Sequence, residues 1–240
     1  WGYATNIMAW EFFNEVDLID DYAAHKGEIK AWHIEMANFL KTLDPNKHLL
    51  TTSFSGSNGH YNELALWDIE HIDFSQIHYY SQASDPQRAQ INLTQDYLAH
   101  FGKPTLIGEF CFSNASQART FDPTGIYLHN TLWATAFSGS LGAAAIWWWD
   151  NYIHPLNLYY HFSPLQRFFS TIDLIDGAFH PITVQAQTPE SEDLTITPAL
   201  GFEHAPEQHF AVLSEGILNP STTSLSSYLF GASWNTDKRN

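Results

Sequence analysis

Residues 7–15 read IMAWEFFNE, and residues 103–112 read KPTLIGEFCF. Both stretches contain a short apolar run with the length and hydrophobicity of a buried β-strand. Each run leads into a glutamate, Glu15 in the first stretch and Glu109 in the second. Because two strand ends can deliver their side chains to one cleft, we expect the two carboxylates to face each other there.

Helix-like segments alternate with strand-like segments around these two runs. Strands are expected at residues 6–11, 48–54, 73–80, 105–110 and 143–149, and helices at 28–43, 86–101, 122–137 and 162–172, with a helical turn at 61–67. Ser163 is the expected N-cap of the last helix. The alternation is typical of βα units and predicts an α/β fold with a parallel sheet.

The composition of the chain changes after about residue 181. Residues 183–240 are rich in Thr, Ser, Pro and Glu, and they contain short β-type runs at 194–197, 209–213 and 224–230. Such runs are typical of part of a small β-sandwich. The sequence therefore predicts two units, an α/β unit at residues 1–180 and an incomplete β-rich domain at residues 181–240.

The 240 residues carry a formal net charge of −16, with only 10 Lys and Arg. No basic cluster can neutralise phosphates, which excludes nucleic acid and anionic membrane surfaces as partners and favours a neutral or cationic one. No apolar run reaches the ~18 residues of a membrane span. Cys111 is the only cysteine, which excludes an internal disulfide, and we expect it to be a small packed residue.

Four consecutive strand ends carry polar or aromatic side chains. They are Asn14 with Glu15, His78 with Tyr80, Glu109, and the run from Trp147 to Trp149. His78 and Tyr80 are two residues apart and should point to one face of their strand, whereas Tyr79 points away. Glycoside hydrolysis needs a pair of carboxyl groups, one as proton donor and one as nucleophile or base. The two glutamates at strand ends fit that requirement.

The order of these motifs, WExxNE, then HxY, then GEF, then a strand ending in tryptophan, resembles the second half of a clan A glycoside hydrolase. Family 5 cellulases and mannanases are the members most similar to it, and the resemblance covers residues 1 to about 170. It implies that the five expected strands are strands four to eight of a (β/α)8 TIM barrel, in which active sites lie at the C-terminal strand ends. The separation of Glu15 and Glu109 suits three βα units of roughly 30 residues each.

The resemblance also implies a role for each site residue. Glu15 would be the general acid/base and Glu109 the nucleophile of a retaining, double-displacement mechanism. Asn14 would hydrogen-bond the sugar 2-hydroxyl, Tyr80 would donate a hydrogen bond to Glu109, and His78 would orient this network. Trp147 would form the floor of the subsite that holds the reacting sugar, and Trp149 is the alternative candidate for that floor. Glu11 would be a buried supporting carboxylate.

The implied substrate is a neutral β-linked polysaccharide of the β-mannan or the β-glucan and cellulose type. The resemblance implies no cofactor, no metal and no obligate protein partner, and it implies an extracellular or periplasmic location. Three alternatives stay open: a non-catalytic carbohydrate-binding protein on a degenerate barrel, an exo-β-glycosidase, and an inverting enzyme. An inverting enzyme would hold its carboxyl groups about 6.5–9.5 Å apart rather than about 5 Å. Asp150, Asn151 and His154 are expected either to bind sugar hydroxyls or to cap a loop.

The sequence departs from the family pattern in one respect. Strands one to three of the barrel are not found in it, and with them the arginine and the histidine that brace the nucleophile in the family. The chain is therefore interpreted as a fragment of a longer enzyme. We expect these 240 residues alone to be inactive or unstable, because an open half-barrel exposes strand edges and apolar surface.

Overall fold

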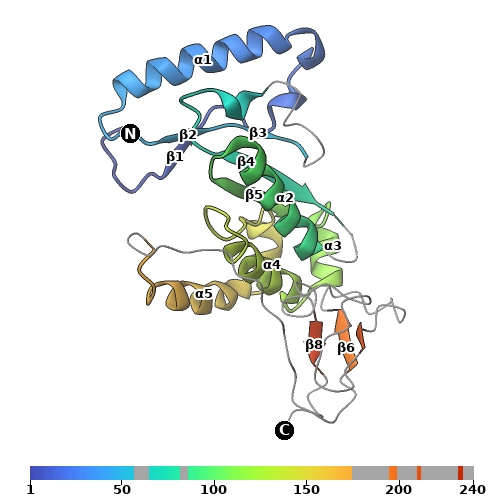
Figure 1. The fold of residues 1–240 in the computed structure, drawn as a ribbon. Coiled ribbons are helices and arrows are strands. Elements are labelled where there is room, and N and C mark those ends of the chain that lie inside the picture. Colours follow the sequence, from blue (N-terminus) through green and yellow to red (C-terminus); the bar gives the residue numbers. More distant parts are fainter. Residues whose placement is uncertain (57–64, 82–85, 175–194, 199–209, 212–231, 235–240) are drawn as a thin grey trace.

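The computed structural model describes residues 1–56, 65–81 and 86–174, together with three short strands nearer the C-terminus (Figure 1). The helical turn expected at 61–67 lies partly outside the described residues. Most of the expected β-rich domain at 181–240 also lies outside them, so the division into two units stays a prediction.

Among the described residues up to 174, five strands and five α-helices follow one another in the order β1-α1-β2-β3-β4-α2-β5-α3-α4-α5. The strands are β1 (Ala9–Glu11), β2 (Leu49–Thr51), β3 (Ser53–Phe54), β4 (Ser75–Tyr80) and β5 (Thr105–Cys111). The α-helices are α1 (Lys26–Leu43), α2 (Pro86–Phe101), α3 (Ala115–Phe121), α4 (Ile126–Ala136) and α5 (Phe162–Phe169). Short 3₁₀ turns are η1 (Val16–Leu18), η2 (Tyr22–Ala24), η4 (Leu66–Asp68) and η6 (Leu158–His161), and η5 (Trp149–Ile153) is a π-helix.

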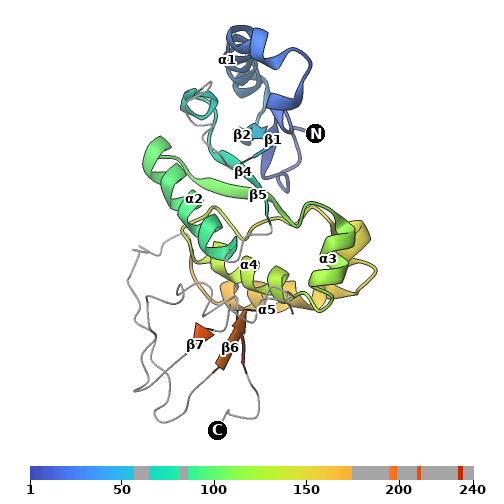
Figure 2. The ribbon, with the colours of Figure 1, turned by 90° about the vertical axis from the view of Figure 1, so that its right-hand side faces the viewer.

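All strand pairs among β1 to β5 are parallel. β1 pairs with β2, and β4 lies between β3 and β5. The strand expected at residues 48–54 is two short strands, separated at Thr52. In Figures 1 and 2, α1 lies beside β1 and β2 at one end of the described fold, and α2, α4 and α5 lie beyond β5. The expected α/β class with parallel strands is therefore confirmed.

The register between β4 and β5 shifts by one residue. Ile77 pairs with Ile107, but the next residue, His78, pairs with Glu109. Gly108 is therefore an extra residue in β5, a β-bulge that re-aims the side chains after it. Glycine is favoured there, because a Cβ atom at position 108 would lie 2.5 Å from the Gln76 side chain and would force it to move.

The strand expected at residues 143–149 is wrong. What remains is a parallel bridge between Phe110 and Ile146, with backbone hydrogen bonds that join Ala145 and Trp147 to β5. The backbone then turns: the amide of Trp149 bonds the carbonyl of Trp147 at 2.8 Å, and the π-helix η5 begins there. Trp147 and Trp149 therefore do not share one strand face. A short apolar run such as AAAIWWW cannot by itself distinguish a strand from other buried segments.

Two expected helices have different starts or ends. The helix expected at 122–137 is α4, which begins four residues later, at Ile126, and ends at Ala136, whereas the short helix α3 before it was not expected. Asp122 instead accepts hydrogen bonds from the amides of Ile126 (2.7 Å) and Leu128 (3.2 Å) and so satisfies the start of α4. The helix expected at 162–172 is α5, which ends at Phe169 and follows His161 as N-cap, so Ser163 lies inside it.

The segment that leads into β4 is fixed by a half-buried cation. The ammonium of Lys103 donates to the carbonyls of Trp67 (2.6 Å), Ile69 (2.8 Å) and Ile72 (2.7 Å). Trp67 is itself fully buried and packs edge-on against neighbouring aromatic rings. Lys103 thus satisfies three carbonyls that a non-repetitive segment would otherwise leave unpaired.

The described C-terminal strands are β6 (Thr195–Pro198), β7 (Phe210–Ala211) and β8 (Ala232–Trp234). They form an antiparallel sheet in the order β7-β6-β8. The strand expected at 224–230 lies outside the described residues. Within the described part of the chain, no helix has both the length and the apolar character needed to cross a bilayer.

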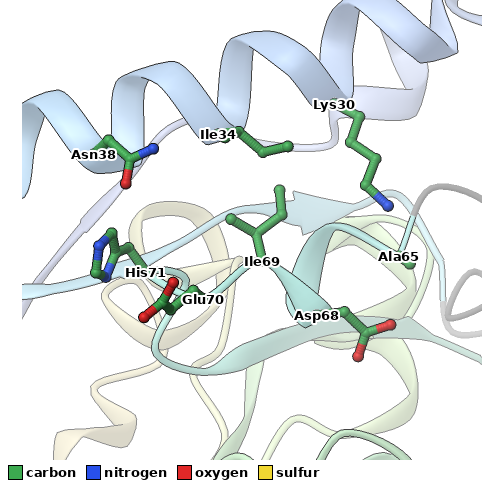
Figure 3. Close-up of a pocket in the computed structure, with 8 residues that line it drawn as sticks. All are labelled: Lys30, Ile34, Asn38, Ala65, Asp68, Ile69, Glu70 and His71. Carbon is green, nitrogen blue, oxygen red and sulfur yellow. The ribbon is translucent and has the colours of Figure 1, made fainter.

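A pocket of about 270 Å³ lies between α1 and the segment from Ala65 to His71 (Figure 3). Ile34 and Ile69 face each other across it. The remaining lining residues are Lys30, Asn38, Ala65, Asp68, Glu70 and His71. None of these residues belongs to the site expected from the sequence.

Candidate active site

Glu15 is placed by the backbone that continues β1 beyond its last paired residue. The amide of Phe12 bonds the carbonyl of Thr51 at 3.0 Å, and the amide of Ser53 bonds the carbonyl of Phe13 at 3.0 Å. Glu15 itself has a left-handed backbone (φ 53°, ψ 60°), which is uncommon for a residue with a side chain. Its amide donates to Oγ of Ser53 at 3.0 Å, so the unusual conformation has a defined partner.

His78 and Tyr80 stand on one face of β4 and both reach the glutamates. Nδ1 of His78 lies 2.8 Å from Oε1 of Glu15 and 3.3 Å from Oε2 of Glu109. The hydroxyl of Tyr80 donates to the same Oε2 of Glu109 at 2.6 Å. His78 is only 1% exposed, so its ring is fixed between the two carboxylates by packing as well as by hydrogen bonding.

The two carboxyl groups are close. One carboxylate oxygen of Glu15, one of Glu109 and a ring nitrogen of His78 all lie within 4.8 Å of one another. Two carboxyl groups at a separation of about 5–5.5 Å are the arrangement of retaining glycosidases, whereas inverting enzymes leave room for a water molecule between them. The separation of the two groups is therefore closer to the retaining arrangement than to the inverting one.

Opposing influences act on the carboxyl group of Glu109, which is 9% exposed. Burial raises its pKa, and the negative charges of Glu15 and Glu11 act in the same direction. The hydrogen bond from Tyr80 and the adjacent His78 lower it. The net direction is upward, so the ionised form of Glu109 depends on Tyr80 and His78. Burial, together with Glu109, also raises the pKa of the Tyr80 hydroxyl, which therefore stays a donor.

Asn14, Trp147 and Trp149 all have exposed side chains. Trp147 is 48% exposed and Trp149 is 61% exposed, so both present aromatic surface to solvent. Sequence reasoning missed the tryptophan between them: Trp148 is half-buried, donates from Nε1 to the carbonyl of Phe112 at 2.8 Å, and lies 6.4 Å from the Tyr80 ring. Trp148 is thus the tryptophan that packs beside the carboxylate network.

The segment that carries Trp149 is fastened to the neighbouring helices. The hydroxyl of Tyr152 donates to Oδ2 of Asp122 at 2.7 Å, and Arg119 donates to the carbonyl of Asn151. Asn151 therefore contacts α3 through its backbone. His154 bonds the Tyr159 hydroxyl at 3.2 Å, which is a contact within the loop.

The structure corrects the expectation that Glu11 is buried. Its side chain is exposed, because β1 pairs on one side only among the described strands. Glu11 nevertheless accepts hydrogen bonds from Ser53 and Gln76, two polar residues that sequence reasoning missed. The serine of HLLTTSF and the glutamine of DFSQIHYY lie in apolar strands, where a polar residue indicates a buried partner.

Among the described residues, one group of three side chains could offer ligand atoms to a metal ion. It consists of Glu15, His78 and Glu109, the same three that hydrogen-bond one another. Nδ1 of His78 is engaged by the two carboxylates, so contacts among the three side chains account for their proximity.

The chain is similar to known proteins over part of its length. No family model matches the chain. A putative mannan endo-1,4-beta-mannosidase 9 from Oryza sativa subsp. japonica is 27% identical over 169 residues, which is 59% of this chain and 41% of that protein. Mannan endo-1,4-beta-mannosidase 5 from Solanum lycopersicum is 28% identical over 174 residues, 60% of this chain and 41% of that protein. The chain thus spans about two fifths of the length of these relatives.

One solved structure is also similar, the hyperthermostable endo-1,4-beta-D-mannanase from Thermotoga petrophila RKU-1 with maltose and glycerol. It has a TM-score of 0.42 and 25% identity, and the match covers 58% of this chain and 45% of that one. The relatives agree with the family that the motif order indicated. Over about three fifths of its length, the chain is similar to mannan endo-1,4-beta-mannosidases, as its resemblance to the clan A glycoside hydrolases predicts.

Proposed function

We propose that the full-length protein that carries this chain is a retaining glycoside hydrolase that cleaves β-linked mannan. The observation that supports this most strongly is the pair of carboxylates on Glu15 and Glu109, which lie within 4.8 Å of each other and share His78 as a neighbour. The names of the relatives favour mannan over cellulose and other β-glucans, and endo action over exo action.

The proposed reaction is a double displacement. Glu109 attacks the anomeric carbon while Glu15 gives its proton to the leaving glycosidic oxygen, which produces a covalent glycosyl-enzyme. Glu15 then takes a proton from a water molecule that attacks the same carbon and releases Glu109. Because each step inverts the anomeric carbon, the product keeps the configuration of the substrate. The two carboxyl groups carry the whole reaction, so it needs no cofactor.

The remaining site residues serve this reaction in stated ways. Tyr80 keeps Glu109 ionised and aimed by donating to Oε2. His78 contacts both glutamates and holds the carboxyl group of Glu15 beside the glycosidic bond to be cleaved. Asn14 binds the sugar 2-hydroxyl, and the exposed rings of Trp147 and Trp149 offer apolar faces on which sugar rings stack.

The fold proposal follows from the parallel order of β1 to β5. We assign β1 to strand four, β2 and β3 to strand five, β4 to strand six and β5 to strand seven of a (β/α)8 barrel, with the bridge at Ile146 as a reduced strand eight. In this arrangement Glu15 follows β1, and His78 and Glu109 lie in the C-terminal halves of β4 and β5, at the strand ends where barrel chemistry is found. Residues 1–180 then form the catalytic unit and residues 181–240 a β-rich unit.

A polysaccharide substrate also supports a location outside the cytoplasm, extracellular or periplasmic. Fractionation of cells that make the full-length protein would test this: enrichment in the medium or periplasm is expected, and an exclusively cytoplasmic protein would contradict it.

The deciding experiment assays the full-length protein on soluble β-mannan, carboxymethyl cellulose, xylan and a polyuronate. Release of new reducing ends from mannan is expected, with little or none from the polyuronate. Glu109→Ala and Glu15→Gln should each lower kcat by about 10²–10⁴-fold or more. Proton NMR of the first product anomer should show retention. Mannan binding without hydrolysis would instead identify a carbohydrate-binding protein, and inversion of the anomer would overturn the double displacement.

A further inference from the structure

Hydrogen bonds to the Glu11 carboxylate form a row that joins three strands, β1, β3 and β4. Oε1 of Glu11, at the end of β1, accepts from Oγ of Ser53 at 2.7 Å and from Nε2 of Gln76 at 2.6 Å. Ser53 belongs to β3 and Gln76 to β4, and both are buried. Two buried donors therefore converge on a single oxygen of a carboxylate whose own side chain is exposed.

The row connects directly to Glu15. The Ser53 hydroxyl donates a hydrogen bond to Glu11, and it accepts a hydrogen bond from the amide of Glu15 at 3.0 Å. Hydrogen bonds in such a chain strengthen one another, because the oxygen that donates becomes a better acceptor. The left-handed backbone of Glu15 is a conformation that persists only where surrounding contacts fix it. Glu11 fixes it by orienting the Ser53 hydroxyl.

The row also connects to Glu109, by packing. Gln76 reaches toward Glu11 across the bulge in β5, where a Cβ atom on Gly108 would lie 2.5 Å from its Cγ and Cδ. Glu109 is the residue immediately after that bulge. The Gln76 side chain therefore constrains the position of the β5 backbone that carries Glu109.

We infer that Glu11 is a positioning residue, which through Ser53 and Gln76 holds the backbones of Glu15 and Glu109 at the separation that double displacement requires. This inference rests on the proposed function. An exposed carboxylate at a sheet edge is usually only solvated. The convergence of Ser53 and Gln76 on one oxygen, and the onward bond from Ser53 to Glu15, distinguish Glu11 from that case.

Three variants of the full-length protein separate the effects. Glu11→Gln keeps an oxygen that accepts from both donors and loses only the charge. Glu11→Ala removes the acceptor, and Ser53→Ala removes the link to Glu15. Glu35→Gln, an exposed carboxylate on α1, is the matched control.

We expect Glu11→Ala and Ser53→Ala to lower kcat on mannan about 10–100-fold, the effect of a catalytic group displaced by a fraction of an ångström, with KM changed less than about threefold. Glu11→Gln should keep most of kcat but move the acidic limb of the pH–rate profile to lower pH, because the negative charge of Glu11 raises the pKa of Glu109. Glu35→Gln should change neither.

A readout without catalysis keeps the inference separate from the proposed function. With ¹³C-labelled glutamate carboxyls, and Glu109 identified by comparison with Glu109→Gln, the titration of Glu109 should move to lower pH in Glu11→Gln and not in Glu35→Gln. Unchanged kcat in Glu11→Ala, or an unmoved Glu109 titration in Glu11→Gln, would overturn the inference. Inactivity of the wild type towards every β-glycan would overturn the proposed function instead, and the titration would still decide the role of Glu11.

Discussion

His78 of β4 lies directly opposite Glu109 of β5, because Gly108 adds one unpaired residue to β5. Without the bulge, Glu109 would pair with Tyr79, whose side chain points to the other face of β4. A shift of one residue reverses the face to which every following side chain points. The contacts of Glu109 with His78 and Tyr80 therefore depend on this glycine.

Gly108→Ala should destabilise the protein and reduce its activity. The added Cβ atom would meet the Gln76 side chain at 2.5 Å, so Gln76 must move or the bulge must straighten. A loss of about 1–3 kcal/mol in the free energy of unfolding is expected, measured by urea denaturation. Gly27→Ala in α1 is the matched control: nothing lies within 4 Å of its Cβ position, and a neutral or slightly stabilising effect is expected there. Equal stabilities of the two variants would contradict the packing argument.

Tyr80→Phe should move the acidic limb of the pH–rate profile to higher pH. The Tyr80 hydroxyl lowers the pKa of Glu109, so its removal raises that pKa and leaves less ionised nucleophile at a given acidic pH. Loss of a hydrogen bond to a charged group costs roughly 1.5–3 kcal/mol, or about 10–100-fold in kcat/KM. Tyr79→Phe, one residue away on the other face, is the control and should leave the limb in place. A shift to lower pH in Tyr80→Phe would contradict this account.

Trp147→Ala and Trp149→Ala should weaken substrate binding more than chemistry. Both rings are exposed, so removing them deletes a stacking surface without opening a core cavity. A loss of about 1–2 kcal/mol per stacked ring would raise KM about tenfold on mannan, with kcat little changed. Trp148→Ala should lower kcat instead, because Trp148 packs beside Tyr80. The same kinetic change in all three variants would argue against separate roles.

Lys103→Met should destabilise the fold. The substitution removes the charged donor of the carbonyls of Trp67, Ile69 and Ile72. Carbonyl groups left without a hydrogen-bond partner lower the free energy of unfolding. We expect a loss of roughly 2–4 kcal/mol by thermal or urea unfolding. Lys47→Met is the control, since the Lys47 side chain is exposed. Similar unfolding midpoints for the two variants would show that the three carbonyls find other partners.

The 240 residues expressed alone should associate and show little hydrolysis. Among the described strands, β1 pairs only with β2, so one edge of the sheet is open. Trp1 is 82% exposed, and Phe39 and Leu43 of α1 are more than half exposed. Open strand edges and apolar patches promote association. Size-exclusion chromatography and a mannan assay test this, and a monomer with the activity of the full-length protein would contradict it.

The parts of the fold with a strong local pattern were predicted well. α1 and α2 follow clear helical periodicity and proline or capping signals, and their ends agree with the expectation to within two residues. The run at 143–149 was predicted as a strand and is not one, because its backbone bonds to β5 only around Ala145 to Trp147 before the chain turns into η5 at Trp149. Local hydrophobicity predicts that a segment is buried, but it does not predict whether a neighbouring strand pairs with the backbone of that segment.

The residues that bear charge at strand ends could be found from the sequence, since their positions relative to apolar runs are visible there. Ser53, Gln76 and the extra residue at Gly108 could not. Their importance comes from contacts between strands that are distant in sequence, and from a register shift that no local pattern encodes. Likewise, His78 was expected to orient the Tyr80–Glu109 pair, while its shorter contact is with Glu15.

The π-helical turn that begins at Trp149 has a consequence for the sugar recognition that we propose. Tyr152 fixes this turn to Asp122, and Arg119 fixes it to α3 through the carbonyl of Asn151. The backbone beneath the exposed indole of Trp149 is therefore ordered before any ligand arrives. A stacking surface that is already rigid loses little conformational entropy when a sugar chain docks, so more of the contact energy remains as affinity.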